Sequence, residues 1–148
     1  MKGYKKFAAM IATSTLIMYG LMYLITYQVS QISFSETRAY LAILMGATMA
    51  IVMLAFMQGM YKNKKLNTAI FIGSFLVFGL SLWLVRSQVT VDQVSWMKAM
   101  IPHHSIAILT SERADITDPR VRELADEIIE AQKREIDEME ALIEELDN

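Results

Sequence analysis

Cysteine is absent from the 148 residues of the chain, which also contain only 2 prolines, 6 glycines and 2 histidines. Without cysteine, disulfide scaffolds, thiolate zinc sites, iron–sulfur clusters and thiol catalysis are excluded. Charged residues are few as well, at 20%, whereas hydrophobic residues reach 54% and methionine occurs 12 times. A chain this short and this apolar is typical of a membrane part with a small appendage rather than of an ordinary soluble domain.

The net charge of −2 conceals a strong asymmetry along the chain. Residues 1–86 carry eight Lys or Arg and one Glu, a charge of +7, whereas residues 87–148 carry six Lys or Arg and fifteen Asp or Glu, a charge of −9. This split indicates a membrane domain over residues 1–86 and an appended acidic domain over residues 87–148. Nucleic acid is not expected as a partner, because its recognition needs a basic face.

Three uncharged segments lie in the basic region, at residues 7–27, 39–58 and 68–85. They contain 21, 20 and 18 residues, and none contains proline. At about 1.5 Å per residue, each is long enough to cross a hydrocarbon core of about 30 Å as a helix. They predict three transmembrane helices in a lipid bilayer, and we interpret the first as a retained anchor rather than a signal peptide.

The distribution of lysine predicts the orientation of these helices. Lysines cluster at the amino-terminal end and in the loop between the second and third segments, whereas the first loop is nearly neutral. The clustered residues are Lys2, Lys5, Lys6, Lys62, Lys64 and Lys65. Because positively charged loops stay in the cytoplasm, we expect a multi-pass protein of a bacterial inner membrane with a cytoplasmic amino terminus. The domain at residues 87–148 is then periplasmic or extracellular.

Methionine recurs at every fourth position of the second apolar segment. The residues of this methionine stripe are Met45, Met49, Met53 and Met57. Beside it lies a stripe of small residues, which favours close contact with another helix. These small residues are Ala42, Gly46 and Ala50. We favour the interpretation that the methionines are flexible apolar filler at a helix contact. The alternative is a thioether ladder in an oligomeric permease for a soft metal.

Two helix start signals follow the membrane region. The run Thr90–Gln93 fits a capping box with threonine at the N-cap, and it predicts a helix over residues 91–114. Asp118 followed by Pro119 marks a second start and predicts a helix over residues 119–146. Because only a few residues separate the two helices, we expect an antiparallel hairpin.

The first hairpin helix gathers both histidines of the chain on one face. At about 100° per residue, an arc of about 120° holds most of the chemistry-bearing side chains of this helix. The arc contains Trp96, Met97, Met100, His103, His104, Ala107 and Ser111. Residues expected to point elsewhere are Ile101, Ile106, Ile108 and Leu109. A helix that is apolar around most of its girth is typical of the centre of a bundle, so we expect two or more hairpins to associate as a homo-oligomer.

The apolar stripe of the second hairpin helix is interrupted by Gln132 and Glu135, close to Met139. A buried amide or carboxylate costs free energy unless it is paired, so these side chains suggest that something binds there. Histidine and methionine without cysteine suit copper, and thioethers favour Cu(I), although other soft or borderline metals fit the same ligands. On spacing alone, the histidines fit equally well as hydrogen-bonded groups of a structural or docking module.

Two stretches of the hairpin contain specific motifs. The first is WMKAMIPHHSIAIL, which contains Met-x-x-His-His. The second is VRELADEIIEAQKREIDEMEAL, which contains Leu-Ala-x-x-Ile-Ile-x-x-Gln-x-x-Glu-Ile-x-x-Met. Together they resemble the bacterial DUF305 family, a family of domains of unknown function. The resemblance covers residues 91–146 and none of the membrane part, and the combined pattern is more specific than either half.

This resemblance implies a ferritin-like fold in which helical hairpins form four-helix bundles, and some extracytoplasmic members bind copper through methionine and histidine. It implies metal-ligand roles for Met100, His103, His104 and Met139, with accessory roles for Glu135 and Gln132. Many members carry a methionine where this chain has Thr110, which weakens the match, and Met97 is a partial substitute.

These observations predict an all-α protein of three transmembrane helices followed by an extracytoplasmic two-helix hairpin. Oligomerisation of this hairpin would complete a ferritin-like four-helix bundle. The expected function is membrane-anchored binding of Cu(I) for buffering, resistance or delivery. Because no catalytic constellation is visible in the sequence, we do not expect an enzyme.

Overall fold

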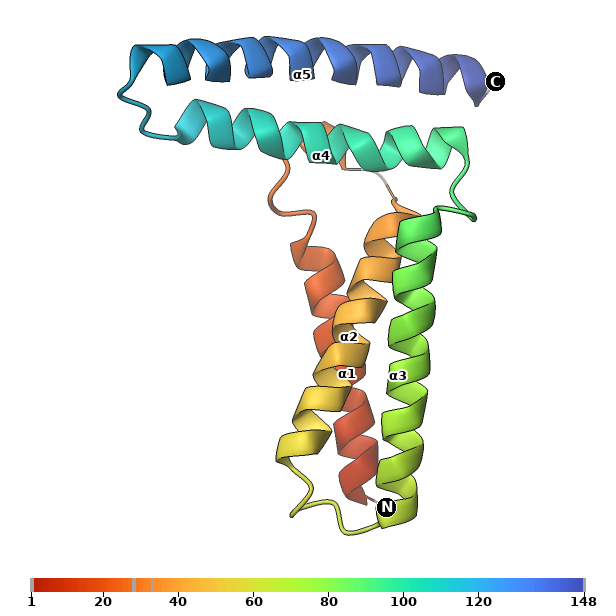
Figure 1. Cartoon of the computed structure of the whole chain (residues 1–148). Coiled ribbons are helices and arrows are strands. Elements are labelled where there is room, and N and C mark those ends of the chain that lie inside the picture. The colour runs from red at the N-terminus through yellow and green to blue at the C-terminus, as the bar shows by residue number, and fades with distance from the viewer. Residues whose placement is uncertain (1, 28, 33, 148) are drawn as a thin grey trace. The chain divides into compact units, whose positions relative to one another are not determined.

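The computed structural model describes residues 2–27, 29–32 and 34–147. The described residues form five α-helices and one short 3-10 helix and contain no strand (Figure 1). The elements are α1 (Lys2–Leu21), η1 (Val29–Gln31), α2 (Glu36–Phe56), α3 (Lys64–Ser87), α4 (Gln93–Arg113) and α5 (Pro119–Leu146). They divide into two compact units. Unit 1 combines Met1–Met22 with Thr37–Thr90, and unit 2 combines Tyr23–Glu36 with Val91–Asn148.

Unit 1 contains the apolar helices of the chain. The helices α2 and α3 are long and apolar enough to cross a membrane, judged by length and composition. The helix α1 begins at Lys2 and ends at Leu21, six residues before the end of the predicted segment 7–27. The side chain of Arg38 donates a hydrogen bond to the carbonyl oxygen of Met22 at 3.1 Å. This bond occupies the carbonyl that a further helical turn would need, so it favours the end of α1 at this point.

Small residues of α2 pack closely against α1. Ala42 and Ala50 are buried, and a Cβ atom on Gly46 would overlap the hydroxyl of Thr15 in α1. The predicted close contact of this stripe with another helix is therefore present within the chain, where Gly46 faces Thr15 of α1. Glycine is required here because the backbone of α2 approaches a side chain of α1 at close range.

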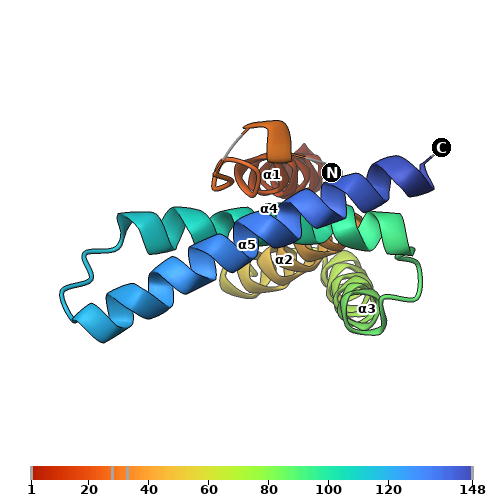
Figure 2. The same ribbon diagram turned by 90° about the horizontal axis from the view of Figure 1, so that it is seen from above.

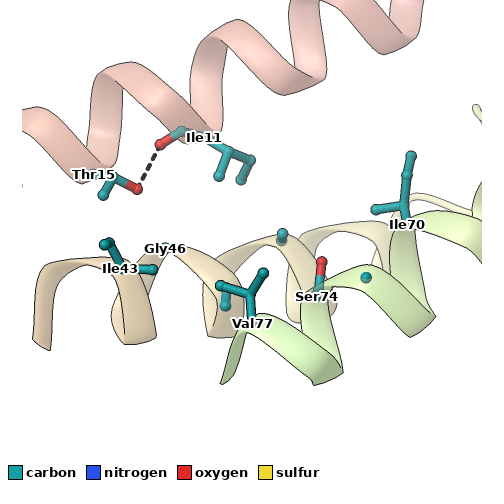
Figure 3. Close-up of a pocket in the computed structure, with 10 residues that line it drawn as sticks. Ile11, Thr15, Ile43, Gly46, Ile70, Ser74 and Val77 are labelled. Atoms are coloured by element: carbon teal, nitrogen blue, oxygen red, sulfur yellow. Dashed lines mark hydrogen bonds between the residues drawn. The ribbon is translucent and has the colours of Figure 1, made fainter. Parts of the chain in front are cut away.

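A groove of about 400 Å³ lies between α1, α2 and α3 (Figure 3). Its lining is almost entirely apolar and includes Ile11, Ile43, Ile70 and Val77. The residues of the methionine stripe are half-buried, three of them on α2 and Met57 just after its end, and they are not part of this lining. Their placement fits packing between helices better than a ladder along the groove.

In unit 2, α4 and α5 lie side by side as an antiparallel pair (Figures 1 and 2). The predicted start of α5 is confirmed, with Asp118 at the N-cap and Pro119 in the first turn. The predicted start of α4 was two residues early, because its N-cap is Asp92, whose carboxylate accepts a hydrogen bond from the N–H of Ser95 at 2.7 Å. A carboxylate is the stronger acceptor for these free N–H groups, and the hydroxyl of Thr90 instead lies 2.9 Å from that of Tyr40.

The core of unit 2 joins both hairpin helices. Its buried members are Met97, Ile101, Ile108, Ile136 and Met139. Ile101 and Ile108 lie outside the arc that holds both histidines, so the buried face of α4 is centred beside that arc rather than on it. Because α4 is apolar around most of its girth, periodicity alone did not identify the face that α5 covers.

The segment Tyr23–Glu36 covers a further part of α4, and this contact was not anticipated. The backbone N–H of Tyr27 donates a hydrogen bond to the hydroxyl of Ser105, which is fully buried. The side chain of Tyr27 packs against the core of unit 2. Part of the apolar surface that seemed to demand a second hairpin is thus buried by the chain's own loop.

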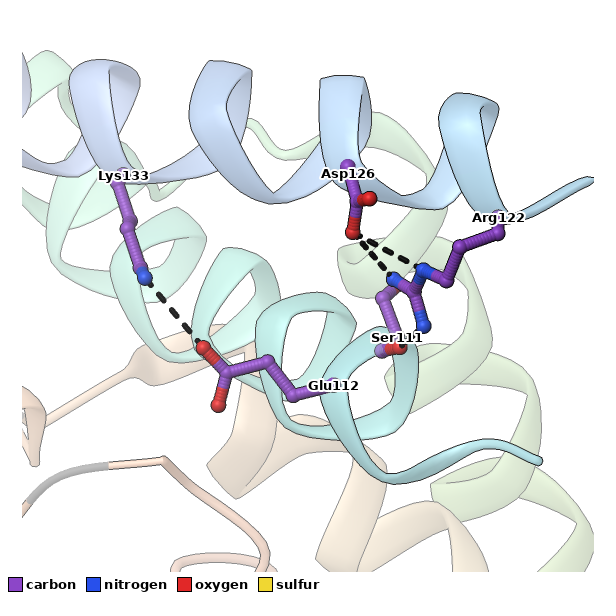
Figure 4. Close-up of polar contacts among 5 residues, drawn as sticks. All are labelled: Ser111, Glu112, Arg122, Asp126 and Lys133. Carbon is purple, nitrogen blue, oxygen red and sulfur yellow. Dashed lines mark hydrogen bonds and ion pairs between the residues drawn. The ribbon is translucent and has the colours of Figure 1, made fainter. Parts of the chain in front are cut away.

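Polar contacts tie α4 to α5 near their connecting turn (Figure 4). Arg122 donates to the carbonyl oxygen of Ser111 at 3.1 Å and pairs with Asp126 at 2.7 Å. Lys133 pairs with Glu112 at 3.3 Å. Exposed ion pairs of this kind contribute about 0–1 kcal/mol each, so core packing rather than charge holds the hairpin together.

Candidate metal centre

The two hairpin helices are joined at mid-length by His104 and Glu135. The ring Nε2 of His104 lies 2.8 Å from Oε2 of Glu135. The histidine side chain is 16% exposed, whereas the carboxylate side chain is 45% exposed. The contact between the two side chains therefore lies at the edge of the core rather than inside it.

The second ring nitrogen of His104 is also engaged. Its Nδ1 lies 3.0 Å from the carbonyl oxygen of Met100, one turn earlier on α4. Both partners of the ring, a carbonyl oxygen and a carboxylate oxygen, accept hydrogen bonds, whereas a neutral imidazole has only one N–H to donate. In the free protein the imidazole is thus held in place from both sides.

Three methionines of the hairpin belong to its hydrophobic core. Met97 and Met139 are buried in the core of unit 2, and Met100 packs against the same cluster. The carbonyl oxygen of Met100 is the partner of Nδ1 of His104, and Met139 lies one helical turn beyond Glu135 on α5. Met100 and Met139 are thus one helical turn from His104 and Glu135, respectively, along their own helices.

The remaining two predicted site residues lie further out. His103 is exposed, and its ring centroid is 6.1 Å from that of His104. Consecutive helix residues differ by about 100°, so when His104 faces α5 its neighbour cannot. Gln132 is half-buried on α5, one turn before Ile136. The structure thus pairs His104 with Glu135 and places Met97, Met100 and Met139 in or against the core of unit 2, whereas His103 is exposed.

The donor set fits a soft metal ion in kind. Thioether sulfur and imidazole nitrogen are ligands that Cu(I) accepts. Within the described ranges, no three side chains of histidine, aspartate or glutamate gather in one place, so a site built from acidic and histidine ligands alone has no support in one chain.

One rearrangement would open the imidazole to a metal. A metal-binding histidine commonly donates its other N–H to a carbonyl, as Nδ1 of His104 is placed to do. Nε2 becomes available if the half-exposed carboxylate of Glu135 turns away from the ring nitrogen. Each chain can therefore offer one well-placed imidazole nitrogen.

The other side of the hairpin contains a cleft of about 340 Å³ beside Tyr23–Glu36. Tyr27 and Gln31 line it together with Lys133 and Asp137 of α5. Sequence reasoning missed this cleft, and the available signal was Ser105, a small polar residue in the middle of an apolar helix. None of the predicted metal-site residues lines the cleft.

Comparison with known proteins supports a relationship through the hairpin. The profile of the family described as "Domain of unknown function (DUF305)" matches residues 85–148. An uncharacterized protein of Acanthamoeba polyphaga mimivirus is 31% identical over 108 residues, which cover 72% of this chain and 69% of that protein. The similarity to that relative extends beyond the family domain, because the 108 matched residues outnumber the 64 residues from 85 to 148. No solved structure matches the chain. The chain is a member of the DUF305 family, and its family domain contains the hairpin with His104 and Glu135.

Proposed function

We propose that the protein is a membrane-anchored, extracytoplasmic binder of a soft metal ion, with Cu(I) as its first candidate. The single observation that carries this proposal is the His104–Glu135 pair, which joins two helices whose core residues include Met97, Met100 and Met139. Its task would be to buffer, detoxify or deliver copper. Other soft or borderline metals fit the same ligands less well, because thioethers prefer monovalent copper.

The proposed ligands are Nε2 of His104 and the thioethers of Met100 and Met139, with Met97 in support. Glu135 would orient the imidazole in the metal-free protein and yield its place when the ion binds. Because a buried or half-buried thioether is poorly hydrated, it loses little hydration free energy when it takes the place of water around a soft ion. Copper would supply no reaction in this account, because the ion is the cargo of the protein.

The membrane part would place this site outside the cytoplasm. The proposal includes three spanning helices, with α1 beside α2 and α3, a cytoplasmic amino terminus and location in a cell membrane. It is supported by the lysines on one side and by the apolar length of α2 and α3. The chain has no cysteine, so single cysteines can report topology directly. Ala141→Cys should react with an impermeant maleimide in intact cells, whereas Lys62→Cys should react only after lysis.

Titration of the full-length protein with Cu(I) tests the metal proposal. His104→Ala and Met100→Leu should each weaken binding by at least tenfold, about 1.4 kcal/mol. Met60→Leu is the matched control, because Met60 is exposed in unit 1 and should leave binding unchanged. Equal affinity in the parent and both site variants would refute the proposal.

A second candidate function is a structural or docking module, and a specific observation favours it. Both ring nitrogens of His104 already have partners within the chain. In this alternative, His104 serves to stabilise the hairpin through its two hydrogen bonds. Cu(I) would then leave the thermal stability of the hairpin unchanged, whereas a metal site would raise it by mass action.

A further inference from the structure

One flank of the hairpin is covered by the chain itself, and the opposite flank is open. The segment Tyr23–Glu36 lies along the side of α5 that carries Lys133 and Asp137. At about 100° per residue, Leu124 and Ile128 lie on the opposite side of that helix. Large apolar side chains are exposed on this second side. We define the open flank by Trp96, Val121, Leu124, Ile128, Leu142 and Leu146.

The open flank is unusual for a helix as charged as α5. Leu124 is 55% exposed and Leu146 is 47% exposed, although charged residues surround them in the sequence. Val121, Ile128, Glu135 and Leu142 follow one another at intervals of seven residues. A seven-residue apolar repeat is the pattern of a helix that packs along another helix. Within this repeat, Glu135 is the single polar position.

The stripe on α5 has the symmetry needed for contact with itself. Glu135 lies near its middle, with Val121, Leu124 and Ile128 on one side and Leu142 and Leu146 on the other. When two copies face each other in opposite directions, one apolar arm meets the other arm of the partner. The polar centres then meet at the two-fold axis. His104, which lies next to the middle of α4, is at the same level because it contacts Glu135.

We propose that the open flank docks against the same flank of a second copy and that this contact joins two His104–Glu135 pairs into one metal site. The axis crosses the helices at the level of Glu135, so that α5 faces α5 of the partner in the antiparallel direction. The inference rests on the proposed function and adds to it the partner and the shared ligands. One chain offers a single well-placed imidazole, whereas two chains offer two imidazoles with thioethers on either side.

The electrostatics of the contact favour a bound cation. In one chain the carboxylate of Glu135 keeps its hydration because it is half-exposed. Docking would remove water from two such carboxylates at once, and buried charges are costly unless they are paired. A metal ion shared by the two imidazoles compensates the carboxylates. The polar centre also fixes the register of an otherwise sliding apolar contact.

Disulfide cross-linking tests the docking geometry with a control in each arm. With the axis at Glu135, Ile128 of one copy lies opposite Leu142 of the other, seven residues away on the far side. Oxidation of the full-length protein with diamide should cross-link a mixture of Ile128→Cys and Leu142→Cys chains. Each variant alone should stay uncross-linked, because equivalent residues are then about 21 Å apart along the helix, whereas a disulfide needs Cα atoms within about 7 Å. Cross-linking of Ile128→Cys chains with themselves, or of no combination, would overturn the antiparallel contact.

Metal stoichiometry tests the shared site. The parent protein should bind one Cu(I) per two chains, and Ile128→Glu should abolish the dimer and lower the affinity for Cu(I) at least tenfold. Ala141→Glu adds the same charge at an exposed position away from the open flank and should change neither property. Unchanged Cu(I) affinity in the monomeric Ile128→Glu variant would overturn the shared site while the proposed function stands. Dimers of the parent that bind no Cu(I) would refute the proposed function and the shared site together.

Discussion

The link between α4 and α5 can be measured by a double-mutant cycle on His104 and Glu135. The variants are His104→Ala, Glu135→Ala and the double substitution, all studied free of metal in the presence of a chelator. The 2.8 Å contact joins a ring nitrogen to a carboxylate oxygen. A hydrogen bond to a charged group contributes about 1.5–3 kcal/mol when it is shielded from water. Glu135 is 45% exposed, so solvent reduces the expected coupling to about 1 kcal/mol.

Thermal unfolding of unit 2, followed by circular dichroism of the full-length protein in detergent, provides the assay. A change of about 1 kcal/mol corresponds to a shift in Tm of roughly 4–8 °C for a domain of this size. We expect the destabilisation in the double variant to be smaller than the sum of the two single effects by the coupling energy. Strict additivity, within about 0.3 kcal/mol, would show that the two side chains act independently. Such additivity would contradict the His104–Glu135 contact, on which the proposed metal centre depends.

Two further predictions concern acid stability and close helix packing. Hydrogen bonds from the side chain and the backbone N–H of Arg120 lower the pKa of Asp118 from its ordinary value of 3.8. The stabilisation by these hydrogen bonds is therefore fully present above pH 3.8 and is lost as pH falls through the lowered pKa of the folded state. Asp118→Asn should keep the helix cap but reduce the dependence of the free energy of unfolding on pH in this acidic range. Gly46→Val should destabilise unit 1 by about 1–3 kcal/mol through overlap with Thr15, whereas Gly79→Val, which meets open space, should have less effect in the same thermal assay.

Local signals in the sequence determined much of the fold. The pair Asp118 and Pro119 sets the start of α5, because a carboxylate cap and a residue without an N–H suit the first turn. The predicted segments 39–58 and 68–85 correspond to α2 and α3, whose charged or polar neighbours mark their ends. Such features depend on residues within one or two turns of each other, so no knowledge of distant contacts is needed.

The rest depended on contacts between distant parts of the chain. The hydrogen bond from Tyr27 to Ser105 spans 78 positions and determines which side of α4 is covered by a loop. That contact, together with α5, determines that the face of α4 with Ile101 and Ile108 forms the core of unit 2. The choice between His103 and His104 had the same origin, because both lie in one sequence motif and only packing decides which of the two faces α5.

X-ray absorption spectroscopy of the Cu(I)-loaded, full-length protein tests the central claim most directly. Our account predicts both sulfur and nitrogen neighbours around the copper, from thioethers and from the imidazole of His104. His104→Ala should remove the nitrogen contribution, and Met100→Leu should reduce the sulfur contribution. A copper spectrum with oxygen and nitrogen neighbours alone, unchanged by either substitution, would contradict the account.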